Sequence, residues 1–356
     1  MRQRCVLWVS TSTETHGGVS SFVRTMQQTP LWGVWGIRHI ATHRNGSVPI
    51  RAIAFGAGAG RFVLELAVRR PQVVHLHMAS YGSFVRKSLL GWAAQAAGVP
   101  VVVHVHGAEF HWFFERSPRL LRMYIRATLE HGSVVIALGE SWARRLKIIA
   151  PRARIVVVPN AVRPRPPVKQ PADGQPVQVL FLGDVSDRKG AFSLIDAWQR
   201  LLESPPEGAA PRLVMAGDGA VARARSRIEE VGLREHVRVL GWIPPNQVES
   251  LVRASQVLVL PSRNEGQPMA VLEAMANGLC VIVSEVGGLP DMVDTDCGVL
   301  VPVDDVPALA SALHRVIVDH EERVRLGLRA LRRVRDRFDV DVTWHALDEL
   351  YEELQR

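Results

Sequence analysis

The feature that most constrains the fold is a repeated alternation of short apolar runs with segments of helical periodicity. In the first half of the chain, helical patterns around residues 19–27, 61–69, 84–97, 117–130 and 140–148 separate apolar runs at 5–10, 37–42, 73–78, 101–106, 134–138 and 155–159. Runs that are apolar at nearly every position predict strands that are covered on both faces. We therefore expect an α/β fold with a parallel sheet.

A proline-rich, polar stretch at residues 164–176 interrupts this alternation and predicts a linker. The pattern then restarts, with strands expected at 177–182, 213–216, 237–240, 257–260 and 281–284, and helices around 191–202, 221–231, 246–254, 268–277, 307–318, 321–337 and 339–354. Two domains are also expected for 356 residues on length alone. We predict Rossmann-like domains at 1–163 and 177–338, with residues 339–356 packing back on the first.

Charge is distributed unevenly between the two halves of the chain. Residues 1–163 hold 21 Lys and Arg against six Glu and no Asp, a net charge of +15, whereas residues 164–356 hold 22 basic and 29 acidic residues, a net charge of −7. A basic body attracts phosphate-rich partners, such as an anionic membrane or a nucleic acid. The alternative interpretation is a solvated, arginine-rich surface without a partner.

The three cysteines, Cys5, Cys280 and Cys297, have no metal-ligand spacing and cannot all pair. We expect them to be small core residues in a reducing compartment. The apolar segment 5–9 is too short for a signal peptide. Because no apolar run approaches the roughly 20 residues that span a bilayer, we expect a soluble or peripheral protein, and the cysteines suit a location in the cytoplasm.

Residues 261–278 carry the most unusual pattern of the second half. A predicted strand ends there, a polar loop with Glu265 follows, and a helix is expected to begin at Pro268. The amide groups of a helix N-terminus bind phosphate, yet two carboxylates, Glu265 and Glu273, flank this one. Each carboxylate would have a role if it accepted hydrogen bonds from sugar hydroxyls.

Two other loops at predicted strand ends contain glycine or basic residues. Gly17 and Gly18 separate the first strand from the first helix, without the full Gly-x-Gly-x-x-Gly pattern of a dinucleotide site. Arg188 and Lys189 follow the strand that opens the second domain. They could neutralise a diphosphate, and a solvated basic pair is the alternative.

Four histidines lie on or at the ends of two predicted strands. His104 and His106 alternate on one of them, and we expect only one of the two to face a given side of the sheet. His106, at the strand end before a glycine, is the favoured candidate. His75 and His77 show the same spacing, and for these we favour a structural role.

The motifs together resemble those of the retaining GT4 glycosyltransferases, also called glycosyl transferases group 1. The resemblance covers nearly the whole chain, and its specific part is the pair of glutamates. It rests on Glu265-Gly266-x-Pro268, Glu273-Ala274-Met275-Ala276-x-Gly278, Gly287-Gly288, the His-Gly-Gly loop at 16–18, His106-Gly107, Val158–Val162 and Phe181–Gly183. It implies the GT-B fold, with two Rossmann-like domains facing a central cleft. It also implies retaining transfer of a sugar from a UDP- or GDP-linked donor to a glycan or lipid-linked acceptor.

The resemblance also implies roles for individual residues. Glu265 would hold hydroxyls of the donor sugar, Glu273 would hold the ribose, and Lys189 would bind phosphate oxygens. His106 would sit over the donor sugar near the reacting carbon. The diphosphate would meet the glycine loop and the helix start, at Gly17, Gly18, Gly266, Gln267, Pro268 and Met269.

One position departs from the family pattern. Family members usually have an arginine directly after the glycine that opens the second domain, and this chain has Asp184 there. We expect Arg188 to supply the missing positive charge. No Asp or His cluster has an evident metal-ligand spacing, so we expect no metal and no other cofactor. In the retaining route that the resemblance implies, the leaving phosphate itself could accept the acceptor's proton.

Other functions remain open on the sequence. A non-catalytic nucleotide or nucleic-acid binder could use the same fold, as could a nucleotide-sugar epimerase or a phosphorylase-like enzyme. The carboxylate that the resemblance assigns to the donor sugar argues against a binder. No segment clearly supplies the pyridoxal lysine of a phosphorylase. A nucleotide-sugar donor is the expected partner, and nucleic acid is not.

Residues 110–126 mix aromatic side chains with arginines, which is typical of a membrane interface. The alternative is a core helix with a solvated face. Together with the net charge of the first half, this segment predicts a peripheral protein on the inner face of the plasma membrane. A lipid-linked acceptor in exopolysaccharide or cell-envelope glycan synthesis would fit such a location.

Overall fold

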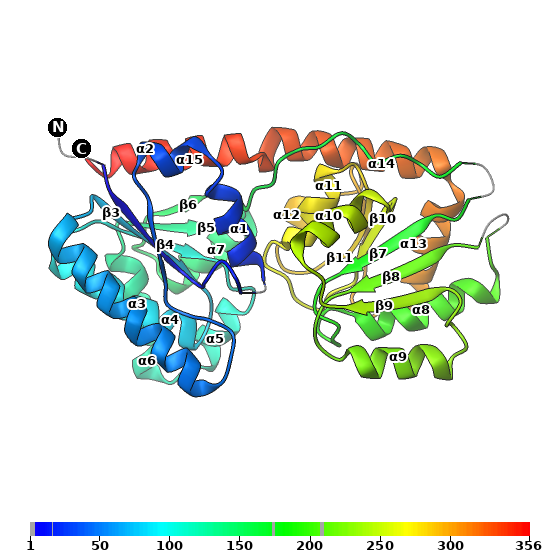
Figure 1. Ribbon diagram of the computed structural model, residues 1–356, viewed down its shortest axis with the longest axis horizontal. Helices are drawn as coiled ribbons and strands as arrows, with labels where there is room; N and C mark the ends of the chain where they lie inside the picture. Colours follow the sequence, from blue (N-terminus) through cyan, green and yellow to red (C-terminus); the bar gives the residue numbers. More distant parts are fainter. Residues whose placement is uncertain (1–3, 16, 173–174, 207–209) are drawn as a thin grey trace. The chain divides into compact units, whose positions relative to one another are not determined.

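A computed structural model describes residues 4–15, 17–172, 175–206 and 210–356 and divides the chain into two compact units. Unit 1 comprises Met1–Ala161 and Val340–Arg356, and unit 2 comprises Val162–Asp339. Each unit is built on a parallel sheet of six strands with helices around it (Figure 1). The prediction of an α/β fold with two parallel-sheet domains is confirmed.

The strands of unit 1 follow the apolar runs of the sequence. Their order in the sheet is β2-β1-β3-β4-β5-β6, and every pairing is parallel. The bounds are β1 Val6–Ser10, β2 Arg38–Ala41, β3 Val73–Met78, β4 Val101–Val105, β5 Val134–Ala137 and β6 Ile155–Val157. Most of these strand residues are buried, because helices cover both faces, as expected for continuous Val and Ile runs.

Two buried clusters separate the helices of unit 1 into layers. One face of the sheet carries α3 Val48–Arg69, α4 Gly82–Ala96, α5 Phe110–Arg116, α6 Arg119–His131 and α7 Glu140–Ile149, and the other carries α1 Gly18–Met26, α2 Pro30–Val34 and α15 Val340–Glu353 (Figure 1). The sequence analysis missed α2, α5 and the first two-thirds of α3. The Gly- and Ala-rich start of α3 has little amphipathic contrast.

The C-terminal helix α15 belongs to unit 1, as the sequence analysis expected. Its buried Tyr351 oxygen accepts a hydrogen bond of 2.9 Å from the indole Nε1 of Trp8 on β1. Asp348 accepts a second indole hydrogen bond, of 2.7 Å, from Trp35. Two tryptophans, one on β1 and one at the end of α2, therefore fix the last helix of the chain within unit 1.

Unit 2 repeats the architecture with the strand order β12-β11-β10-β7-β8-β9. Its strands are β7 Gln178–Leu182, β8 Arg212–Ala216, β9 Val237–Gly241, β10 Val257–Leu260, β11 Cys280–Ser284 and β12 Val299–Val301. Its helices are α8 Ala191–Glu203, α9 Val221–Glu230, α10 Pro245–Arg253, α11 Met269–Ala276, α12 Leu289–Met292, α13 Val306–Val318, α14 His320–Arg333 and a π-helix Val334–Phe338. The short elements β12 and α12 were not predicted.

The proline-rich stretch is not a free linker in the part that the structure describes. The amide of Arg165 donates to the carbonyl of Ala276 (2.8 Å), and that of Val168 donates to Asn277 (2.9 Å). The segment is therefore fastened to unit 2, and the units divide after Ala161 and after Asp339. Composition indicated a linker, but the backbone between prolines still has amides that can form hydrogen bonds.

Two smaller expectations also have outcomes. The three cysteines are free and buried, as expected for core residues. Within the described part of the chain, none of the helices has both the length and the apolar character needed to cross a membrane.

Two helical glycines should respond oppositely to alanine. Gly327 on α14 packs so closely on the backbone after α11 that an added Cβ would lie 2.1 Å from the Gly278 carbonyl oxygen, whereas a Cβ at Gly60 on α3 would meet nothing within 4 Å. We expect Gly60→Ala to stabilise the protein by about 0.5–1 kcal/mol through helix propensity. Gly327→Ala should instead destabilise it by about 1–3 kcal/mol through overpacking. Urea unfolding of both variants checks this, and stabilisation by both would contradict the packing described.

Candidate active site

Glu265 is a buried carboxylate held by two partners at the end of β10. Its residue is only 4% exposed. Its Oε1 accepts a hydrogen bond of 2.7 Å from Ser262 Oγ and lies 2.5 Å from the ammonium of Lys189. A buried carboxylate needs such pairing, because removing it from water is costly. The structure thus brings together two predicted site residues that are 76 positions apart.

Glycines allow the loops around this pair to approach one another. Gly287 has a φ of +61°, and an added Cβ would lie 2.0 Å from the carbonyl oxygen of Glu265. The amide of Gly288 donates to the same carbonyl at 3.1 Å. Gly190 has a φ of +70°, and an added Cβ there would lie 2.0 Å from the carbonyl oxygen of Pro261. Larger residues would separate the backbone segments that carry Glu265 and Lys189.

The predicted helix after the loop is α11, which begins at Met269 rather than at Pro268. Pro268 is the residue before the helix, with an extended backbone (φ −69°, ψ 123°). The expected position of this proline was therefore wrong by one residue. Gly266 and Gln267 are buried in the loop before it. The start of α11 lies within four residues of Glu265, so a carboxylate and a helix N-terminus share one short segment.

Glu273 and Arg188 occupy different environments. Glu273 lies on α11 and is partly buried, and its carbonyl accepts a hydrogen bond of 2.8 Å from the Asn277 side chain. Arg188 is exposed in the loop after β7, where its carbonyl accepts a hydrogen bond of 2.8 Å from the amide of Arg263. The guanidinium of Arg188 therefore reaches solvent next to Lys189.

Ser262 is a site residue that the sequence analysis missed. Its hydroxyl donates directly to the carboxylate of Glu265, and the residue is fully buried. The spacing Ser-x-x-Glu after a strand was the only signal available. A serine in a polar loop is too common to single out without the contact.

The glycine loop of unit 1 lies between β1 and α1. Gly17 precedes the first residue of the helix with a φ of +126°, and a Cβ there would meet nothing within 4 Å. Gly17 and Gly18 are both exposed. His16, the first residue of the predicted His-Gly-Gly loop, lies outside the described residues. Backbone conformation, rather than a close neighbour in unit 1, accounts for glycine at position 17.

All four strand histidines of unit 1 lie on one face of the sheet. The rings of His104 and His106 stack with centroids 4.0 Å apart, and those of His75 and His77 stack at 4.4 Å. The expectation that only one of His104 and His106 faces a given side was wrong. Residues two apart on a strand share a face, because the side-chain period is two.

Hydrogen bonds link this histidine cluster to the C-terminal helix. The Tyr351 hydroxyl, which accepts from Trp8, contacts His75 Nδ1, and His75 Nε2 lies 3.2 Å from His104 Nδ1. In a second pair, His77 Nδ1 lies 3.0 Å from His106 Nε2. Because the indole can only donate, the Tyr351 proton is free to be donated to His75.

The histidines of this cluster are held in the neutral form. Burial lowers the pKa of His106 to about 3, with a further contribution from the charge of Lys87. Burial also lowers the pKa values of His75, His77 and His104 well below the ordinary range. A neutral His106 can donate or accept one hydrogen bond towards a ligand, but it does not contribute a positive charge.

The cluster also has the composition of a metal site. His75, His77 and His104 place one ring nitrogen each within 4.8 Å of one another, and the Nε2 atoms of His77 and His104 have no hydrogen-bond partner. The sequence analysis had found no cluster with metal-ligand spacing, because the three residues come from two strands. Stacking and the pairs with Tyr351 and His106 account for most of the ring contacts.

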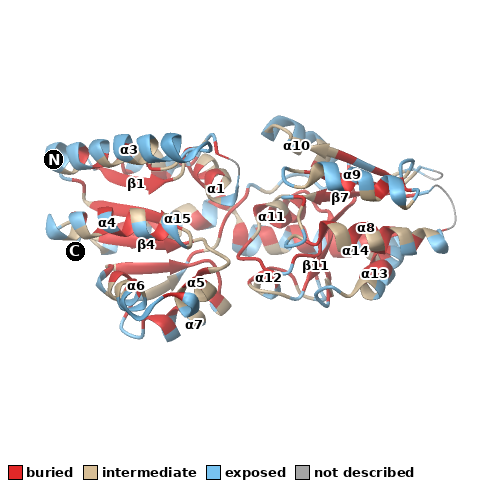
Figure 2. Cartoon of the chain, turned by 90° about the horizontal axis from the view of Figure 1, so that it is seen from below, coloured by how far each residue is buried: buried red, intermediate tan, exposed pale blue. Residues whose placement is uncertain are grey.

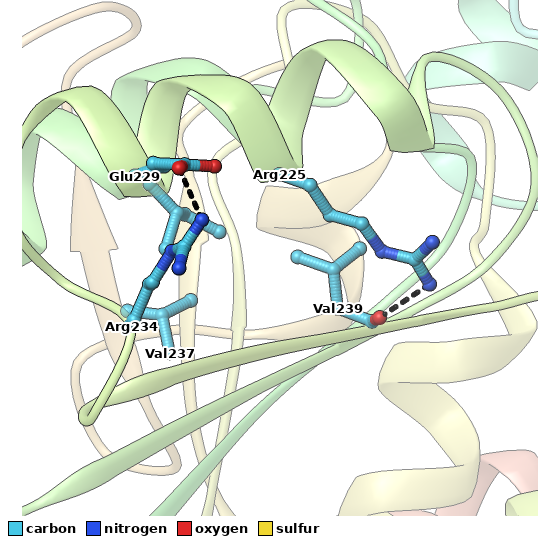
Figure 3. Close-up of a pocket in the computed structure, with 6 residues that line it drawn as sticks. Arg225, Glu229, Arg234, Val237 and Val239 are labelled. Atoms are coloured by element: carbon cyan, nitrogen blue, oxygen red, sulfur yellow. Dashed lines mark hydrogen bonds and ion pairs between the residues drawn. The ribbon is translucent and has the colours of Figure 1, made fainter.

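A separate small pocket lies between α9 and β9 of unit 2 (Figure 3). Within it, Arg234 pairs with Glu229, and Arg225 donates a hydrogen bond of 2.9 Å to the carbonyl of Val239. None of the predicted site residues lines this pocket. Its arginines already have protein partners, so the Lys189–Glu265 region is the better candidate site.

Family models match both units. Residues 14–161 match the model described as glycosyl transferase 4-like domain, and residues 162–333 match the model described as glycosyl transferases group 1. The border between the two matches coincides with the division between the units after Ala161.

Relatives and solved structures agree with these matches. The chain is 31% identical over 263 residues to the putative colanic acid biosynthesis glycosyltransferase WcaL of Escherichia coli strain K12, covering 69% of this chain and 63% of that protein. Sucrose-phosphate synthase from Thermosynechococcus elongatus has a similar structure (TM-score 0.83, 20% identity, 99% of both chains). So does Anabaena Alr3699/HepE in complex with UDP-glucose (TM-score 0.76, 17% identity, 98% of this chain and 99% of that one). The predicted GT-B fold is confirmed.

Histidine burial should make stability depend on pH. The four cluster histidines stay neutral in the folded chain, whereas in the unfolded chain they bind protons below their ordinary pKa of about 6.5. As the pH is lowered below that value, the free energy of unfolding should therefore decrease. The decrease should be up to about 1.4 kcal/mol per pH unit for each histidine, until the pH reaches the pKa of that histidine in the folded chain. Urea unfolding between about pH 7 and about pH 5 measures this slope.

The variant His104→Phe provides the comparison for this slope. It removes one titrating ring but keeps an aromatic side chain in the cluster, so its slope should be shallower than that of the wild type. Equal slopes for the two proteins would show that His104 is not kept neutral by the fold.

Proposed function

We propose that this chain, which carries a glycosyl transferase 4-like domain followed by a glycosyl transferases group 1 domain, is a retaining glycosyltransferase that uses a nucleotide-diphospho-sugar. Unit 2 would bind the donor, and unit 1 would bind the acceptor. The observation that carries this proposal is the ion pair between the buried Glu265 and the partly buried Lys189, beside the start of α11. UDP is the first candidate nucleotide, since the similar structure of HepE contains UDP-glucose.

The site chemistry suits such a donor. The Lys189 ammonium and the amides at the start of α11 can stabilise the negative charge that grows on a departing diphosphate. The Glu265 carboxylate can accept hydrogen bonds from hydroxyls of the donor sugar, and Glu273 is assigned to the ribose. Without donor, Lys189 and Glu265 neutralise each other. With donor bound, Lys189 would pair with the diphosphate, and Glu265 would accept hydrogen bonds from the sugar hydroxyls.

His106 is assigned to the donor sugar near the reacting carbon. Its lowered pKa means that it acts as a neutral hydrogen-bonding group rather than as a cation. In a retaining reaction on one face of the sugar, the departing phosphate can itself take the proton of the acceptor. The proposal therefore needs no separate general base.

We further propose that the reaction needs no metal ion. Fixed cations at the diphosphate would replace it, with Lys189 from unit 2 and Arg188 in place of the arginine that Asp184 displaces. The exposure of Arg188 next to Lys189 supports this assignment. His75, His77 and His104 of unit 1 would then have a structural role and would not hold a catalytic metal.

The setting that fits best is exopolysaccharide or cell-envelope glycan synthesis at an anionic membrane, on the cytoplasmic side. Support comes from the name of WcaL, a putative colanic acid biosynthesis glycosyltransferase, and from the +15 charge of residues 1–163. The chain spans only 63% of the length of WcaL, so the acceptor remains part of the proposal. A glycan or a lipid-linked sugar would serve.

A panel of UDP-, GDP- and ADP-sugars tests the proposal, with sugar release and transfer as the readout. We expect turnover of at least one UDP- or GDP-sugar. The variant Glu265→Gln should lower kcat by about 100-fold or more, because it weakens contacts to the reacting sugar. The exposed Glu285→Gln is the matched control and should retain activity. Full activity of Glu265→Gln in a folded protein would refute the assignment.

The role of Arg188 can be measured separately. Arg188→Ala should raise KM for the donor by about 10-fold, in keeping with the loss of one charged hydrogen bond to phosphate. Arg212→Ala, at another exposed arginine of unit 2, should have no effect. Both assays are run with and without a chelator, which should not change the rates. Unchanged kinetics of Arg188→Ala would remove it from the site.

A further inference from the structure

The helix α3 of unit 1 is unusually exposed for its apolar composition. Over its 22 residues, Val48–Arg69, only Gly58, Phe62 and Glu65 are buried. Figure 2 shows the helix largely in the colour of exposed residues. The large apolar side chains Val48, Ile50, Ile53, Val63, Leu64 and Val68 are between 49% and 72% exposed. A folded domain rarely leaves so many such side chains on one helix in water.

A narrow stripe fastens α3 to the sheet. An added Cβ at Gly58 would lie 2.4 Å from the carbonyl of Ala41, so the helix lies directly against the end of β2. One turn later Phe62 is fully buried, and Glu65 pairs with Arg38 of β2 at 2.7 Å. These anchors use one side of the helix only. The exposed apolar side chains therefore belong to a helix that is firmly packed against the sheet.

Half of these exposed apolar side chains lie on the side of α3 away from the sheet. At about 100° per residue, Ile53, Val63 and Leu64 fall within one arc that is nearly opposite the buried stripe. The neighbouring helix α4 packs against α3 and adds Leu89, which is more than half exposed. Exposed apolar side chains therefore occur on both α3 and its neighbour α4.

Every exposed charge on α3 is positive. Arg51, Arg61 and Arg69 are exposed on the helix, and Arg44 and Arg70 are exposed just beyond its ends. Between residues 15 and 108 the sequence contains nine Lys and Arg but a single acidic residue, and that residue is Glu65, which is buried. An apolar helix whose exposed charges are all positive is the pattern of a helix that lies in the plane of an anionic membrane.

We infer that α3 is the surface through which unit 1 binds an anionic membrane, with its apolar side chains entering the interface and its arginines meeting lipid phosphates. A second copy of the chain fits less well, because like arginines would face one another. This inference rests on the membrane partner of the proposed function and names the surface responsible. It does not depend on which sugar is transferred.

The proposed membrane surface lies on α3, whereas the sequence analysis expected it at residues 110–126. In that segment Phe110 and Phe113 are buried in the core. The aromatic residues that suggested a membrane interface are thus partly structural. Leu120 and Met123 on α6 remain exposed and supply the competing surface for the test.

Flotation of the full chain with phosphatidylcholine vesicles, with and without phosphatidylglycerol, provides the test. We expect binding only when phosphatidylglycerol is present, and weaker binding at high salt. The double variant Ile53→Glu, Leu64→Glu should bind at least about tenfold more weakly. Val318→Glu with Leu328→Glu, at exposed apolar positions of unit 2, is the matched control and should bind as the wild type does.

A second pair of variants avoids any question of folding. Arg51→Ala with Arg61→Ala removes two exposed charges without touching the buried stripe, and it should also weaken binding. Loss of binding in Leu120→Glu with Met123→Glu, but not in the α3 variants, would overturn the inference and assign the surface to α6. Self-association in sedimentation that the α3 variants abolish, without vesicle binding, would overturn it in favour of a second copy.

Transferase activity distinguishes failure of this inference from failure of the proposed function. Assayed with a water-soluble acceptor, the α3 variants should keep the wild-type rate. If no protein binds vesicles but sugar transfer persists, the membrane inference fails and the proposed reaction stands. If vesicles bind through α3 but no donor is turned over, the proposed reaction fails and the membrane surface stands.

Discussion

The ion pair between Lys189 and Glu265 is the interaction on which the rest of unit 2's site depends. A buried carboxylate and a partly buried ammonium are costly to hold apart from water, so each requires the other or a ligand of equivalent charge. Ser262 supplies a further hydrogen bond. Gly190 and Gly287 are the positions where the surrounding backbone comes close enough to hold the pair. The site is therefore assembled before any ligand arrives, and its charges suit a sugar diphosphate.

The sheet architecture explains why these residues meet. Lys189 follows β7 and Glu265 follows β10, and these strands are neighbours in the parallel sheet. Carboxyl ends of parallel strands lie on one edge of a sheet, so side chains from distant parts of the sequence converge there. In unit 1 the same rule gathers His77 and His106 from β3 and the end of β4. Both units thus place their polar groups at the carboxyl ends of central strands.

Much of this organisation could be predicted from the sequence. Eleven strands were expected from apolar runs, and all eleven are present within one or two residues of the expected bounds. Continuous Val and Ile runs are reliable because burial on both faces requires them. The three-residue β12 was missed because so short a segment has no period to detect. The N-terminal part of α3 was missed because it is almost wholly apolar apart from Arg51, and an exposed helix is expected to show a polar face.

The candidate site was predictable in its residues but not in its contacts. The motifs singled out Lys189, Glu265 and His106, whereas the ion pair, the Ser262 hydrogen bond and the shared face of four histidines needed the structure. The segment 164–176 shows the opposite case. Its composition indicated a linker, yet the backbone amides of Arg165 and Val168 donate hydrogen bonds to carbonyl groups at the end of α11. Amino-acid composition indicates which backbone conformations are favoured, whereas tertiary hydrogen bonds determine which of them the folded chain adopts.

The central claim is that the segment from Glu265 to the start of α11 holds a nucleotide-diphospho-sugar. Hydrogen–deuterium exchange of the full chain, with and without a saturating UDP- or GDP-sugar, measures this directly. The account predicts slower exchange of the amides around residues 265–272 and around Lys189. Protection confined to the pocket between α9 and β9, or no protection in unit 2 with a donor that demonstrably binds, would contradict it.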